Sequence, residues 1–227
     1  MYAGASYPGG GRVELSGATT ANWVAKSANL LVDGLGGPDR VGLLLPLHWQ
    51  AVALLLAGVA TGAAVVVADD VDGLSGCDAA FVAGQHAEAA VAAGIDEVLA
   101  LSCHPLGAPL ASVPSSAADY AREVPSYADH WSGGAPPGVS IEVAGSRLGP
   151  LPDLGLSGAD RVLVAVDPAD RSGLAGLLAG LQAGASLVLL PAPHEVDLPA
   201  VAAAERVTAA LGLAGGGRDL PGVRLLA

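Results

Sequence analysis

The segment LLAGVATGAAVVV, residues 55–67, recurs with small changes as LLAGLQAGASLVLL, residues 177–190. Each copy follows an Arg-Val segment that begins about fifteen residues earlier, RVGLLLP at Arg40 and RVLVAVDP at Arg161. Because similar residues recur at similar spacing, the two regions are expected to form the same local structure.

The residue pattern of each copy predicts a buried strand, a helix and a second buried strand. Gly62 and Gly184 stand where glycine commonly ends a helix, and an apolar run follows each of them at once. Consecutive strands joined by a helix are parallel. The repeat therefore predicts two similar β-α-β units, about residues 40–69 and 161–190, in an α/β fold with an open, mostly parallel sheet or sheets and helices on both faces.

Two further patterns refine this fold. Thr19 or Thr20 is expected to cap a helix that runs through Leu35. In the second repeat, Gly176, Gly180 and Gly184 are four residues apart. This spacing predicts a helix face without side chains that lies very close to its sheet.

The domain organisation is predicted as a single α/β domain over residues 1–227. A proline-rich connector at 102–138, which contains one short capped helix, separates two possible lobes at 1–101 and 139–227. The sequence leaves open whether these lobes share one sheet or form two.

The charge balance excludes several partners. The formal net charge is -12, and Lys26 is the only lysine. Nucleic acids and anionic membranes are bound by clustered cations, so neither is an expected partner.

An uncharged stretch at residues 51–68 is about long enough to cross a bilayer. The Thr61-Gly62 break and the β-branched residues after it favour a buried helix, turn and strand instead. No basic segment followed by an apolar core opens the chain, so a cytoplasmic protein without a membrane span is expected.

The residues 13–69, from VELSGATTANWVAKSANLL to GAAVVVAD, resemble the N-terminal region of the adenylate-forming superfamily, which includes the acyl-CoA synthetases. The segment Asp160 to Pro191 resembles a later part of the same enzymes. The resemblance implies their fold. It also identifies the chain as similar to short, truncated and degenerate relatives of these AMP-binding enzymes rather than to a complete synthetase.

The resemblance also implies a phosphate-binding loop that ends in Pro-Lys-Gly, and here only WSGGAPPGV, residues 131–139, occupies that interval. Ser132, Gly133 and Gly134 are the candidate remnant of the loop, and Pro137 stands where lysine is expected. The family's ribose-binding aspartate and catalytic lysine have no matching positions. No catalytic residue is therefore assigned, and no cofactor is predicted.

In an open α/β sheet, ligands bind at the carboxyl ends of the strands. Those ends offer His48 as a candidate anion ligand at a helix N-terminus; the alternative is a histidine in the first helical turn beside a buried Trp49. After the second Arg-Val strand, Asp167 and Asp170 are candidates that replace an aromatic-His pair of the family.

The spacing of the remaining histidines does not indicate a metal site. Cys77 and Cys103 are interpreted as reduced, partly buried thiols rather than as a disulfide or a nucleophile.

Three functions remain open. The first is a non-catalytic cytoplasmic module that binds a ligand or a protein partner. The second is a half-adenylation enzyme that binds ATP, AMP or CoA and is completed by a partner chain or a second protomer. The third is a structural homodimer.

Overall fold

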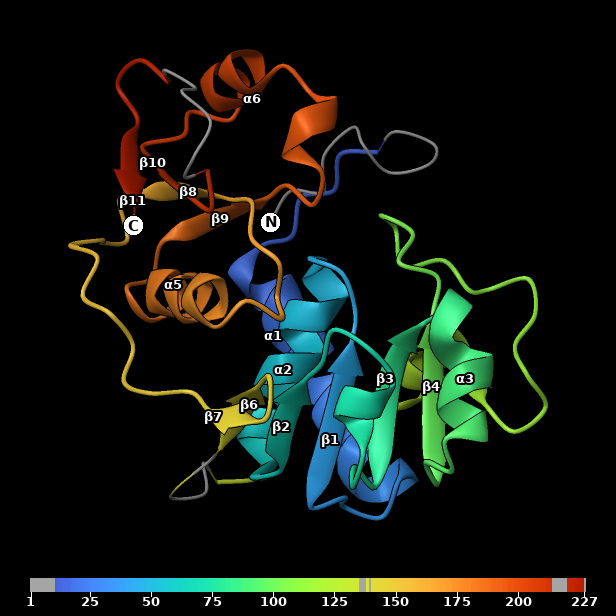
Figure 1. Ribbon diagram of the computed structural model, residues 1–227. Helices are drawn as coiled ribbons and strands as arrows, with labels where there is room; N and C mark the ends of the chain where they lie inside the picture. Colours follow the sequence, from blue (N-terminus) through green and yellow to red (C-terminus); the bar gives the residue numbers. More distant parts are fainter. Residues whose placement is uncertain (1–10, 135–137, 139, 214–219, 227) are drawn as a thin grey trace. The chain divides into compact units, whose positions relative to one another are not determined.

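A computed structural model describes residues 11–134, 138, 140–213 and 220–226 of the chain (Figure 1). The chain divides into two compact units. The N-terminal unit is Leu15–Leu148, and the C-terminal unit combines Met1–Glu14 with Gly149–Ala227. The predicted connector thus belongs to the N-terminal unit, because strand β6 (Ile141–Val143), which follows it, pairs with strand β2 (Ala64–Val67).

The N-terminal unit holds a seven-stranded sheet with the order β5-β4-β3-β1-β2-β6-β7. Every pair in it is parallel except β6 with β7, which form an antiparallel turn. The other strands are β1 (Arg40–Leu44), β3 (Ala79–Ala83), β4 (Glu97–Leu101), β5 (Ala118–Asp119) and β7 (Ser146–Arg147).

Helices cover both faces of this sheet (Figure 1). One face packs against α1 and α2, where Gly58 lets α2 approach Val65 of β2. The other face packs against η2 and α3, with a core of small and branched side chains that includes Leu74, Ala80 and Ala90. The helical elements are α1 (Gly17–Asn29), the π-helical turn η1 (Leu30–Gly34), α2 (Trp49–Thr61), η2 (Asp72–Leu74), η3 (Gly84–His86), α3 (Ala87–Ala92), α4 (Tyr120–Glu123) and η4 (Val124–Ser126).

Helix α1 differs at both ends from the prediction. Its N-cap is Ser16, whose hydroxyl accepts a hydrogen bond from the main-chain N–H of Thr19 at 3.0 Å, so the two threonines lie inside the helix. After Asn29 the chain widens into η1, in which the N–H of Leu35 reaches the carbonyl of Leu30. The threonines misled the prediction because serine, one turn earlier, caps equally well.

The C-terminal unit holds a separate four-stranded parallel sheet with the order β11-β10-β8-β9. Helix α5 covers one face, and α6 packs on the other face with Leu198 and Ala202. The elements are β8 (Arg161–Val164), α5 (Arg171–Gln182), β9 (Ser186–Leu189), η5 (Pro193–Glu195), α6 (Leu198–Ala204), β10 (Ala209–Leu211) and β11 (Arg224–Leu226).

The two sheets repeat the same connectivity over four strands. In each, the first strand leads through a helix to a parallel neighbour, and the third and fourth strands then add on the opposite side of the first. Each sheet also has an equivalent main-chain hydrogen bond at the start of its first strand. In the N-terminal sheet the N–H of Asp78 donates to the carbonyl of Arg40 at 3.0 Å, and in the C-terminal sheet the N–H of Thr208 donates to the carbonyl of Arg161 at 2.9 Å. The predicted fold class and its two β-α-β units are confirmed, and the repeat extends further than the sequence indicated.

The close approach of α5 to its sheet is also confirmed, with one change in the residues. A Cβ atom on Gly176 would lie 2.6 Å from Leu211 of β10, and one on Gly180 would lie 3.2 Å from Leu187 of β9. The stripe continues to Gly173, which faces Val166. Gly184 follows the helix with φ +74°, so it ends the helix instead of contributing to the stripe.

The apolar stretch at 51–68 forms α2, a turn at Gly62 (φ +88°) and β2, as predicted. Among the helices of the described ranges, none has the length and apolar character that a membrane crossing requires.

A buried carboxylate joins three segments of the C-terminal unit. Glu205, only 7% exposed, accepts hydrogen bonds from Arg12 Nε and Arg161 Nη2, both at 2.8 Å. The hydrogen bond from Arg12 is the main reason that the pKa of Glu205 lies below its ordinary value. The carboxylate thus fastens residue 12 to the start of β8 and the end of α6.

We expect Glu205→Gln to lower the free energy of unfolding by about 1–2 kcal/mol at neutral pH, because charge-assisted bonds to a buried group are lost. A carboxylate with a lowered pKa stabilises the fold above its unfolded pKa and loses that effect as the pH falls through the folded pKa. The variant should therefore lose less stability on acidification. Denaturant titrations between pH 7 and pH 3 measure this, and Glu14→Gln, which removes the exposed partner of Arg12, should change little.

Candidate functional site

The carboxyl edge of the N-terminal sheet is the best-defined candidate site. From β1 the chain leaves through α2 toward β2, whereas from β3 it leaves through α3 toward β4 on the opposite side. Such a reversal between neighbouring strands is the usual ligand position in open α/β sheets. Here the edge contains His48, Trp49 and Gln50 and is covered by the segment 102–110, which we call the strap.

His48 is the N-cap of α2. Its backbone is extended, and its Nδ1 accepts a hydrogen bond from the main-chain N–H of Gln50 at 3.2 Å. The side chain is 1% exposed, and burial lowers its pKa to about 4, so the imidazole is neutral at pH 7. Trp49 is buried beside His48, as the alternative interpretation expected. His48 itself is the N-cap of the helix and does not lie in its first turn.

The strap closes over the start of α2. The indole Nε1 of Trp49 donates to the carbonyl of Pro105 at 2.8 Å. A Cβ on Gly107, where φ is +64°, would lie 3.1 Å from both Trp49 Cζ2 and Gln50 Nε2. Gln50 is 2% exposed, and its Oε1 accepts no hydrogen bond from the described residues. The strap therefore covers the start of α2, and the Oε1 of Gln50 is a buried acceptor beneath it.

Asp119, at the end of β5, fastens the far end of the strap. Its Oδ2 accepts from the N–H of Leu110 at 2.7 Å, and its Oδ1 caps α4 through the N–H of Ala121 at 2.9 Å. The hydroxyl of the next residue, Tyr120, forms a hydrogen bond of 2.8 Å with the hydroxyl of Ser27 in α1, and either group can be the donor. Sequence reasoning anticipated a capped helix in this region but missed that its cap also holds the strap. An aspartate directly before the helix was the available signal.

The candidate phosphate-loop remnant lies in an irregular, exposed segment. Ser132, Gly133 and Gly134 belong to no helix or strand, and a Cβ on Gly133 would collide with the indole ring of Trp131. Pro136 and Pro137 lie outside the described residues. Upstream of the remnant, Lys26 donates to the carbonyls of Pro125 and Tyr127, so the only lysine of the chain fastens this segment to α1.

Asp167 and Asp170 share one turn after β8 in the C-terminal unit. Asp167 Oδ1 accepts from the N–H of Ala169 at 2.9 Å, and Asp170 Oδ2 accepts from that of Gly173 at 2.6 Å as the N-cap of α5. Both carboxylates thus complete a local turn. His48 and the residues 132–134 belong to the other unit.

Neither cysteine has the environment of a nucleophile. Cys77 and Cys103 are free and buried, and burial raises the pKa of both thiols, that of Cys103 to about 12. No cluster of three metal-ligating side chains occurs in the part of the chain that the structure describes.

A protein of Mycobacterium tuberculosis, described as a TIGR03089 family protein, is 38% identical over 211 residues, which are 89% of this chain and 87% of that protein. The chain belongs to the TIGR03089 family. A scan against protein-family models found no match to the chain.

Solved structures place this TIGR03089 protein in the adenylate-forming fold. An acyl-CoA synthetase of Brucella canis aligns with a TM-score of 0.71 and 19% identity over 94% of this chain, and a benzoate CoA ligase of Burkholderia xenovorans with 0.66 and 18% over 89%. The chain spans 45% of each of these proteins. The likeness confirms the resemblance to acyl-CoA synthetases at the level of the fold.

Proposed function

We propose that this TIGR03089 protein is a cytoplasmic, non-catalytic binding or protein-interaction module built on the adenylate-forming fold. The observation that carries the proposal is that three of the side chains expected to hold a ligand already make bonds within the chain itself. His48 caps α2, Asp170 caps α5, and Asp167 completes the turn before α5. A phosphate group would have to compete with these internal bonds.

The strap supports the same proposal. It covers the switch point of the N-terminal sheet through the contacts of Trp49 with Pro105 and Gly107. A scaffold whose usual ligand position is covered is suited to contacts on its outer surface.

Thermal unfolding of the purified protein against ATP-Mg, AMP and CoA tests the proposal. We expect no shift of the midpoint and no ATP-pyrophosphate exchange with carboxylic acids. A ligand at a hundred times its dissociation constant adds about 2.7 kcal/mol to the stability of the folded state, which is easily seen. Exchange activity of the purified chain alone would contradict the proposal.

A half-enzyme completed by a partner chain is the second candidate, because the chain spans less than half of the solved synthetases that it resembles. In that case residues 132–134 would contact a nucleotide. Replacing Gly133 and Gly134 together by leucine should then abolish nucleotide affinity, and unchanged affinity would exclude a role for this loop.

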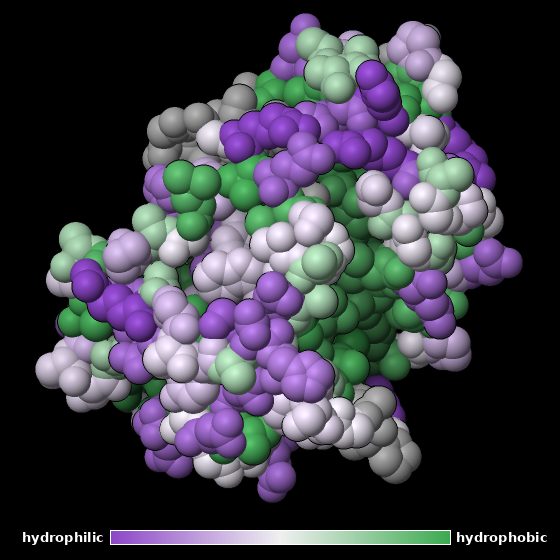
Figure 2. Space-filling model, turned by 180° about the vertical axis from the view of Figure 1, so that it is seen from behind, coloured by the Kyte–Doolittle hydropathy of each residue, from purple (hydrophilic) through white to green (hydrophobic). Residues whose placement is uncertain are grey.

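A structural homodimer is the third candidate. Three large hydrophobic side chains are exposed among the described residues, Val32, Leu106 and Leu225, and Figure 2 shows hydrophobic residues on the surface beside strongly hydrophilic ones. Light scattering at several protein concentrations distinguishes a dimer from a monomer.

A further inference from the structure

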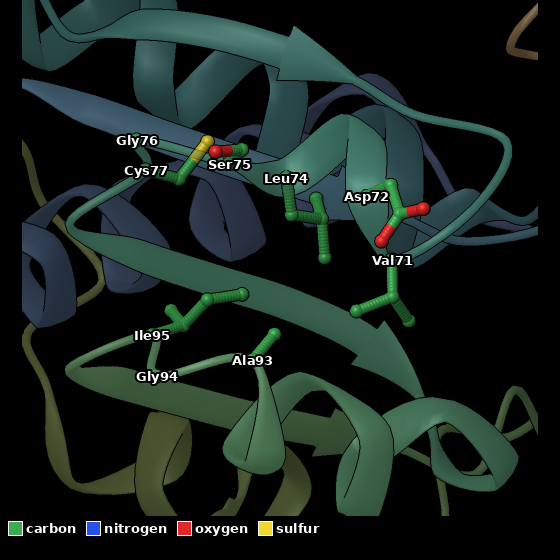
Figure 3. A pocket seen from close by; sticks show the side chains of 9 residues that line it. All are labelled: Val71, Asp72, Leu74, Ser75, Gly76, Cys77, Ala93, Gly94 and Ile95. Carbon is green, nitrogen blue, oxygen red and sulfur yellow. The ribbon is translucent and has the colours of Figure 1, made fainter.

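A groove of about 590 Å³ lies in the N-terminal unit, away from the carboxyl edge. Its walls come from η2 and the residues after it and from the turn between α3 and β4 (Figure 3). Cys77 lies two residues before β3, and Ile95 lies two residues before β4, so this end of the groove is at the amino ends of these strands. It is therefore separate from the candidate site under the strap.

The groove exists because this face of the sheet has a thin cover. The crossover from β2 to β3 contains only the three-residue turn η2, and α3 has six residues, whereas α2 on the opposite face has thirteen. The core beneath is built largely of alanine, including Ala80, Ala87 and Ala90. Short covering elements and small side chains leave a space between the two walls.

Apolar side chains line both walls of the groove, and polar residues are interspersed among them. Val71 and Leu74 project from the η2 wall, and Ala93 and Ile95 project from the opposite wall (Figure 3). Cys77 lies at one end of the groove, and burial raises the pKa of its thiol. An aliphatic group fits such a lining by burying apolar surface.

The rim of the groove is acidic. Asp72 is part of the lining, and Asp78, Asp96 and Glu97 are exposed residues adjacent to its lining residues. The sequence from 69 to 97 contains seven carboxylate side chains and no lysine or arginine. The guanidinium of Arg40, on the neighbouring strand, is engaged by Glu142 at 3.0 Å. The rim thus attracts cations.

We propose that this groove docks a basic, amphipathic segment of a partner protein, with an aliphatic side chain between its walls and arginine or lysine at the acidic rim. Arginine and lysine match this chemistry because their aliphatic stems lie on apolar surface while their charged ends reach carboxylates. The inference rests on the proposed interaction function and specifies the partner's chemistry.

Fluorescence anisotropy with a labelled, amidated eight-residue peptide of alternating leucine and arginine tests the proposal at about 0.15 M salt. The full chain should bind this peptide and should not bind the matching leucine-glutamate peptide. Ala93→Trp, which fills the groove without changing charge, should weaken binding about ten-fold. Ala18→Trp, at an exposed position of α1, is the matched control and should bind as the wild type does.

A second pair of variants tests the charge. The double variant Asp72→Asn/Asp96→Asn should weaken peptide binding at least five-fold. The double variant Asp33→Asn/Asp129→Asn removes the same amount of charge elsewhere and should have a smaller effect. The groove is not the docking site if the wild type does not bind the peptide, or if a groove variant and its matched control weaken binding equally. Neither result bears on the nucleotide and exchange assays, so failure of this inference and failure of the proposed function are distinguishable.

Discussion

Replacing Gly212 by alanine should destabilise the C-terminal unit by about 2–4 kcal/mol. Gly212 directly follows β10 with φ +82°, a conformation that costs alanine energy even in open space. In addition, the new Cβ would collide with the main-chain carbonyl oxygen of Ala165, the residue after β8. Because a backbone atom cannot rotate away as a side chain can, the end of β8 or β10 must move.

The control for this variant is Gly222→Ala in the same unit. Gly222 has φ +77°, but a Cβ there would meet no atom within 4 Å, so its substitution carries the conformational cost alone. The three tryptophans of the chain lie in the N-terminal unit. The measurement therefore requires far-UV circular dichroism in denaturant together with hydrogen exchange of β8 and β10 amides. Equal losses in the two variants would contradict the collision with Ala165.

The sequence predicted the parts of the fold that repeat or follow strong local rules. Gly62 marks a helix end in the structure as it does in the sequence. The pairing of β6 with β2 could not be predicted, because about seventy residues separate the two strands and β6 has only three residues. Short strands acquire their pairing from tertiary contacts that a local pattern does not contain.

The sequence indicated where to look for a ligand site but not how the residues there are arranged. Open α/β topology indicated the carboxyl edge and His48, and the structure places His48 there. The cover over this edge depends on contacts of Trp49 with Pro105 and Gly107, which are more than fifty residues away from it in sequence and belong to no motif. Likewise, the hydrogen bonds of Asp167 and Asp170 to their own turn depend on local geometry that residue identity alone does not reveal.

The strap gives the second large expected effect: Asp119→Ala should lower the free energy of unfolding of the N-terminal unit by about 2–4 kcal/mol. The substitution removes the N-cap of α4, which contributes about 1 kcal/mol. It also leaves the N–H of Leu110 without its carboxylate acceptor, at a cost of about 1–3 kcal/mol. The loss should be read from tryptophan fluorescence in denaturant.

The same variant should also open the carboxyl edge locally. If Asp119 fastens the strap, amide exchange should accelerate in residues 102–110 before the sheet unfolds, and the emission of Trp49 should shift to longer wavelength as water reaches its ring. Asp119→Asn is the matched variant, because it retains an oxygen to accept one of the two N–H groups, and it should show a smaller change. Accelerated exchange confined to α4, with the strap as protected as in the wild type, would show that Asp119 only caps its helix and that Trp49 and Gly107 hold the strap closed.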